Sequence, residues 1–141
     1  MDLSEVANTR KIFFTNLLLL GFNPEINEAQ TRIHFHQDMF KVPNRAAFEI
    51  VIKYLLDKLD PIRSNQEFRD CWPIGDKKRE MEFRKVCVAW LTQIASEPDS
   101  NLPTIAQSLF LSPGGQRCDQ LLANFSRYVL KIVMKKELGT E

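Results

Sequence analysis

Apolar residues recur at intervals of three and four along most of this chain, which is the period of helices that bury one face. The pattern predicts a first helix from about Leu3 to Leu20, with Gly21 as its C-cap. A second helix is expected after Asn44, and Asp60-Pro61 ends it. Its apolar stripe is unbroken and consists of Phe48, Val51, Ile52, Leu55, Leu56 and Leu59.

The rest of the chain continues the helical pattern, with turn residues between segments. The further helices are expected at residues 65–71, 76–96, 103–111 and 116–136. Asp76 is the expected N-cap of the long one, whereas Thr31 to His36 alternates over too few residues for a strand and is expected to form an extended loop. The sequence therefore predicts an all-α fold of six or seven helices.

Length and composition indicate a single domain with an ordinary core. The chain has 141 residues, of which 44% are apolar and 26% charged. The net charge of +1 argues against nucleic acid or a membrane surface as a partner. The cysteines Cys71, Cys87 and Cys118 are odd in number and widely spaced, which favours a reducing compartment such as the cytoplasm over a disulfide framework.

No pattern in the sequence commits to catalysis, a metal or a cofactor. His34 and His36 lie two positions apart, as a pair of ligands would, but no third ligand stands at a partner spacing. The turn Ser112 to Gly115 lacks the lysine and hydroxyl of a phosphate loop, so it is expected to be structural. No cysteine has the paired histidine of a nucleophile, and a non-enzyme is expected.

Local clusters of positive charge are the strongest functional feature. On the helix expected at 76–96, the residues opposite the apolar stripe include Lys77, Lys78, Arg84 and Lys85. On the last helix, Arg127, Lys131 and Lys135 are spaced four apart. Both sets could be ordinary solubilising faces, or they could contact an acidic protein surface such as the tubulin lattice.

Several runs of residues carry a resemblance to a known family. The most specific runs are FRDCWPIGDKK at 68–78, EFRKVC at 82–87 with Trp90-Leu91, and SLFLSPGG at 108–115. They resemble the N-terminal domain of subunit 6 of the augmin (HAUS) complex. Shorter matches at 20–24, 38–40, 44–48 and 125–128 extend the resemblance over nearly the whole chain.

The resemblance implies a single calponin-homology-like domain over residues 1–141, as the N-terminal fragment of a longer coiled-coil subunit. It further implies a place in the microtubule-facing head of the complex, beside a second calponin-homology-like subunit. Through the whole complex, the gamma-tubulin ring complex would be recruited for branching nucleation of microtubules in the mitotic spindle. The implied locations are the cytoplasm, the cytoskeleton, the spindle and the centrosome. Trp72, Pro73, Phe83, Trp90 and Gly114 are expected to be architectural on physical grounds.

Two functions from different classes remain open. The leading hypothesis is a module that binds the microtubule lattice through the two basic sets. The alternative is a structural head that only docks on a neighbouring subunit, for which Met81 and Val88 are expected to supply exposed apolar contacts. Actin binding is a third option, but no motif in the sequence supports it.

Overall fold

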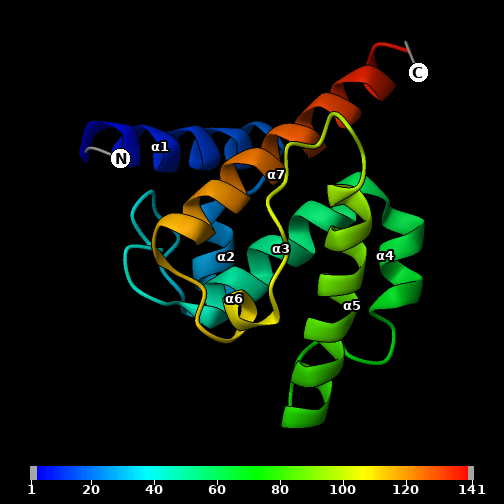
Figure 1. The fold of residues 1–141 in the computed structure, drawn as a ribbon. Coiled ribbons are helices and arrows are strands. Elements are labelled where there is room, and N and C mark those ends of the chain that lie inside the picture. The colour runs from blue at the N-terminus through cyan, green and yellow to red at the C-terminus, as the bar shows by residue number, and fades with distance from the viewer. Residues whose placement is uncertain (1–2, 140–141) are drawn as a thin grey trace.

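The computed structural model describes residues 3–139 and contains helices but no strand within that range. The helices are α1 (Leu3–Leu19), α2 (Pro24–Thr31), α3 (Arg45–Leu59), α4 (Pro61–Glu67), α5 (Lys77–Ala95), α6 (Gln107–Leu111) and α7 (Gly115–Glu137). Figure 1 shows α3 in the middle, with α1 and α7 above it and α4 and α5 to its right. The predicted all-α class is confirmed.

Helix α3 is the core of the molecule because its apolar stripe is completely buried. The buried residues are Ala47, Phe48, Val51, Ile52, Leu55, Leu56 and Leu59. The Asn44 side chain accepts a hydrogen bond from the Ala47 backbone at 3.2 Å and so caps the start of the helix. Asp60 ends α3 and at once begins α4, since its carboxylate accepts from the Arg63 backbone at 3.1 Å.

Helices α1 and α7 pack side by side and run in the same direction (Figure 1). Contacting residues advance together along the two helices, as expected for parallel helices. Arg10 Nε donates to Asp119 Oδ2 at 3.1 Å, and two turns further on Asn16 Nδ2 donates to Ser126 Oγ at 3.1 Å. Because Asp119 and Ser126 are both buried, these bonds satisfy polar groups that would otherwise lie unpaired in the core.

An aromatic cluster joins the turn after α4 to α5. The Phe68 ring lies 5.2 Å from the ring of Phe83 and 6.3 Å from that of Trp90, measured between centroids. The Trp72 ring lies 5.4 Å from that of Phe83, and the bond between Trp72 and Pro73 is cis. This packing supports the prediction that these aromatic residues are architectural.

The turn between α6 and α7 is fixed against the segment before α3. The Gly115 backbone donates to the Phe40 carbonyl at 2.8 Å, and the Asn44 backbone donates to the Pro113 carbonyl at 3.0 Å. A Cβ atom added to Gly114 would lie 2.7 Å from the backbone nitrogen of Pro43. The turn is therefore structural, as the sequence predicts, and only glycine fits where the two segments meet.

Local caps explain one helix that the sequence does not predict and one helix that lies earlier than predicted. Helix α2 was not expected, yet Asn23 accepts a hydrogen bond from the Ile26 backbone at 2.9 Å and Pro24 occupies the first turn. Arg32 then adopts a left-handed conformation with φ of 62°, which ends this helix. Helix α4 covers Pro61–Glu67 instead of 65–71, because its cap is Asp60.

The segment before α6 also differs from the prediction. Residues 101–106 form no regular element, and α6 begins at Gln107 rather than at Pro103. The backbone of Leu102 instead turns toward the Ser100 hydroxyl, which it contacts at 3.4 Å. The predicted stretch from Thr31 to His36 lies mostly in an extended loop after α2, where Phe35 is buried against Phe22.

Candidate interaction surface

The first basic set lies along the outer face of α5. Asp76 caps this helix by accepting a hydrogen bond from the Arg79 backbone at 2.8 Å. Because Phe83, Cys87 and Trp90 are buried on the inner face, the opposite face is turned to solvent. A shallow groove of about 620 Å³ runs over this outer face. Its lining, which we call the α5 groove, consists of Lys78, Met81, Glu82, Arg84, Lys85 and Gln107.

The lysines of this surface are available for contacts, whereas Arg84 is partly neutralised. Lys77, Lys78 and Lys85 are exposed and have no ion-pair partner within residues 3–139. The Arg84 side chain is only 17% exposed, and its guanidinium lies 3.7 Å from the Glu80 carboxylate. Arg84 is therefore less exposed than the sequence suggests and takes part in a network within the chain, and its contact with tubulin stays a prediction.

That network connects α5 to α3. Arg45 Nη1 donates to Glu80 Oε1 at 2.9 Å, so Glu80 bridges the arginines of two helices. Glu49 lies near the same charges. Burial raises the pKa of the Glu49 carboxyl above its usual value, the Arg45 charge opposes the increase, and Glu80 adds to it. The inner side of the basic face is thus a charge network that orders α5 against α3.

The second basic set lies on α7 beside an acidic loop. Arg127 and Lys131 line a small cavity of about 40 Å³ together with Asp99 and Tyr128. Burial raises the pKa of the Tyr128 hydroxyl, and the nearby charges of Glu97 and Asp99 raise it further. These carboxylates weaken the positive potential at Arg127 and Lys131.

The structure does not bring the two basic sets together. In Figure 1 the first turns of α5 lie at the bottom, and the last turns of α7, which carry Lys135, lie at the upper right. Each set would therefore contact a different part of a partner. Lys135 is exposed and engaged in an interaction of its own within the chain.

The two apolar interface candidates behave differently. Met81 is 53% exposed and lies in the α5 groove between the basic side chains. Val88 is half-buried and packs against the core, so the expectation of an exposed Val88 is wrong.

The sequence-based prediction missed two residues of the groove, Glu82 and Gln107. Glu82 follows Lys78 by one helical turn and could have been found from that spacing, whereas Gln107 reaches the groove only through tertiary packing.

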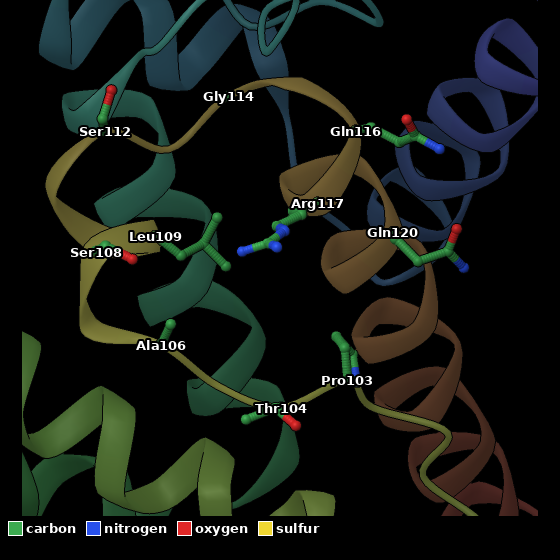
Figure 2. Close-up of a pocket in the computed structure, with 10 residues that line it drawn as sticks. All are labelled: Pro103, Thr104, Ala106, Ser108, Leu109, Ser112, Gly114, Gln116, Arg117 and Gln120. Carbon is green, nitrogen blue, oxygen red and sulfur yellow. The ribbon is translucent and has the colours of Figure 1, made fainter. Parts of the chain in front are cut away.

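A larger cavity, of about 870 Å³, lies between the 103–106 segment, α6 and the start of α7 (Figure 2). Its lining residues are Pro103, Thr104, Ala106, Ser108, Leu109, Ser112, Gly114, Gln116, Arg117 and Gln120. In Figure 2 the Arg117 side chain extends from α7 into the space faced by Leu109 of α6. Arg117 is the one charged residue of this lining, and the remaining polar groups are hydroxyls and amides. This set offers hydrogen bonds but neither a nucleophile paired with a base nor a metal site.

The histidines and cysteines make contacts within the fold. His34 Nδ1 lies 2.8 Å from Glu28 Oε1, and the His34 and His36 rings stack with centroids 4.8 Å apart. Within residues 3–139, no three histidine, cysteine or acidic side chains are grouped to hold a metal ion. Cys71, Cys87 and Cys118 are buried, and burial raises the pKa of each thiol above its ordinary value.

None of the described helices is both long enough and apolar enough to span a bilayer.

The fold and its surface define an all-helical domain with a basic groove on one helix. Residues 13–140 match the family model for the N-terminus of HAUS augmin-like complex subunit 6. The chain belongs to this family.

Two curated relatives support the assignment. HAUS augmin-like complex subunit 6 of Danio rerio is 38% identical over 122 residues, which cover 84% of this chain. The protein of the same name from Homo sapiens is 37% identical over 131 residues, which cover 89% of this chain. The chain spans only 15% and 14% of the lengths of these two relatives.

Proposed function

We propose that this chain is a non-catalytic module of an augmin-like complex and contributes to binding of the microtubule lattice. Through the complex it would serve branching nucleation and assembly of the mitotic spindle. Its partners would be the other augmin subunits, in particular a second calponin-homology-like subunit, and the gamma-tubulin ring complex through the assembly as a whole. It would form one calponin-homology-like domain of a longer coiled-coil subunit, located in the cytoplasm, at the cytoskeleton, the spindle and the centrosome.

The observation that carries the proposal is the outer face of α5. Lys77, Lys78 and Lys85 are exposed there without ion-pair partners within residues 3–139, in a protein whose net charge is only +1. Such a local excess of positive charge attracts an acidic protein surface and loses strength as salt is added. One module of this kind binds weakly, and a complex with several contact points would raise the overall affinity.

Co-sedimentation with stabilised microtubules at low and moderate salt tests the proposal. The chain should pellet with microtubules at low salt, and the double variant Lys78→Glu/Lys85→Glu should pellet less. Lys11→Glu/Lys58→Glu is the matched control, because it changes the net charge equally at exposed positions of α1 and α3. If the wild-type chain stays in the supernatant at both salt concentrations, the proposal that it binds microtubules is wrong.

The second candidate function is a structural head that docks on a neighbouring subunit without touching tubulin. The Met81 side chain is 53% exposed within the α5 groove and favours this alternative, since methionine is enriched at protein interfaces relative to the rest of the surface. Met81→Glu should then abolish a pull-down of the neighbouring subunit. Microtubule pelleting of the wild-type chain separates the two functions, because a purely structural head does not pellet at all.

A further inference from the structure

The shape of the α5 groove restricts what can occupy it. The groove is concave and has a volume of about 620 Å³, within the range of roughly 300–1,000 Å³ that is usual for ligand sites. One wall is the outer face of α5, and Gln107 at the start of α6 contributes from the other side. A single extended peptide segment can enter such a hollow.

The charges of the groove are arranged along one line. Lys78 and Lys85 are separated by seven residues, so they lie two turns apart on the same face, at a rise of about 10.5 Å. A peptide in the polyproline II conformation repeats every three residues with a rise of about 9 Å. Acidic side chains three positions apart in such a peptide therefore have a spacing close to that of the two lysine positions along α5.

The remaining lining residues fit the same occupant. Met81 lies one turn from each lysine and offers apolar contact to the aliphatic part of a glutamate side chain. The amide of Gln107 can donate to or accept from a peptide backbone. Glu82 is the one acidic residue of this lining, and it would repel an acidic ligand.

We propose that the α5 groove binds an extended acidic peptide segment of a partner protein. The identity of the partner rests on the proposed function, since the flexible C-terminal tails of tubulin are acidic segments at the microtubule surface. The groove then holds the tail, and Lys77, outside the groove, adds a longer-range attraction. Removal of the Glu82 charge strengthens binding, whereas reversal of either lysine weakens it.

Microtubules whose tails have been removed with subtilisin provide the first test. The affinity of the chain for intact microtubules should exceed that for the trimmed ones by about three- to tenfold, as expected for a few exposed ion pairs. Lys78→Glu/Lys85→Glu should abolish this difference, Glu82→Gln should increase it, and Lys11→Glu/Lys58→Glu should preserve it. Equal binding to intact and trimmed microtubules would overturn the inference and leave the proposed function in place.

A second test needs no microtubules and separates the two proposals. An octaglutamate peptide is titrated into the chain, and the backbone amide resonances are followed by NMR. Shifts should concentrate at residues 78–85 and at Gln107, and they should disappear in Lys78→Glu/Lys85→Glu. If the chain does not bind intact microtubules but shows these shifts, the groove still binds acidic peptides and only the proposed function fails. If the groove resonances do not move, the inference is wrong.

Discussion

The Arg10 guanidinium and the Asp119 carboxylate form an ion pair that holds α1 against α7, with Nε and Oδ2 at 3.1 Å. The Asp119 side chain is 5% exposed and that of Arg10 is 13% exposed. Arg10 also reaches Asp38 in the loop before α3, at 3.8 Å. Burial raises the pKa of the Asp119 carboxyl, and the Arg10 charge and hydrogen bond oppose the increase. The guanidinium thus offsets part of the cost of burying this carboxyl group.

Loss of Arg10 alone should cost more stability than loss of the whole pair. Arg10→Leu leaves Asp119 buried without its main counter-charge, and we expect the free energy of unfolding to fall by about 3 kcal/mol. In Arg10→Leu/Asp119→Leu the uncompensated charge is gone, so much of that loss should be recovered. Urea unfolding followed by circular dichroism at pH 7 measures both variants. A double variant at least as unstable as the single one would contradict this account.

The close approach at Gly114 leads to a second prediction. Its φ of −179° is ordinary extended backbone, so the restriction comes from the Pro43 backbone, 2.7 Å from an added Cβ. Gly114→Ala should lower the free energy of unfolding by about 1–3 kcal/mol, as overpacking does elsewhere. Gly75→Ala is the matched control, since nothing lies within 4 Å of its added Cβ. Thermal unfolding of the two variants checks the contrast, and equal melting temperatures would refute it.

The apolar pattern of the sequence predicts those helices that have one continuous buried face. The α3 stripe, from Phe48 to Leu59, is an example, and the Asp76 cap of α5 follows from local residue chemistry alone. Helix α2 has no buried residue, so it leaves no apolar stripe to detect. The sequence signal for α2 is the pair Asn23-Pro24 at its start, and this combination also occurs in turns.

The candidate site could be predicted only in part, because some of its residues meet through packing between helices. A helical projection places Lys78 and Lys85 correctly on the outer face of α5, because that depends on the helix alone. It also places Glu80 one turn before Arg84, but it cannot show that Arg45 of α3 pairs with the same Glu80, since that contact depends on how α3 packs on α5. Gln107 is more than twenty residues away in sequence and enters the groove through the packing of α6 near α5.

The buried cysteines lead to a third prediction, which also tests the non-enzymatic assignment. Cys71, Cys87 and Cys118 have thiol pKa values raised by burial, so little thiolate forms near neutral pH. Native protein should therefore react with Ellman's reagent at pH 7.5 far more slowly than protein in 6 M guanidinium chloride, where all three thiols react. Rapid modification of one equivalent in the native protein would contradict this and identify an activated cysteine, for which Cys71→Ser is the direct check.

Glu49 leads to a fourth prediction, on the dependence of stability on pH. Burial raises the pKa of Glu49 in the folded chain above the ordinary glutamate value of about 4.3. Between these two pKa values the folded state binds more protons than the unfolded state. The free energy of unfolding therefore falls as pH rises through that interval. The stability that a protonated Glu49 contributes is fully present below the ordinary pKa and is lost above the folded one.

Glu49→Gln removes this titration while keeping the shape of the side chain. Relative to the variant, the wild type should be most stable at low pH and should lose that advantage as pH rises from about 4 through the window set by Glu49. Urea unfolding midpoints from pH 3.5 to pH 7.5 measure the difference. Glu25→Gln, at an exposed position of α2, controls for the chemical change itself. A difference between wild type and Glu49→Gln that grows in favour of the wild type as pH rises would mean that the Arg45 attraction outweighs burial at this carboxyl.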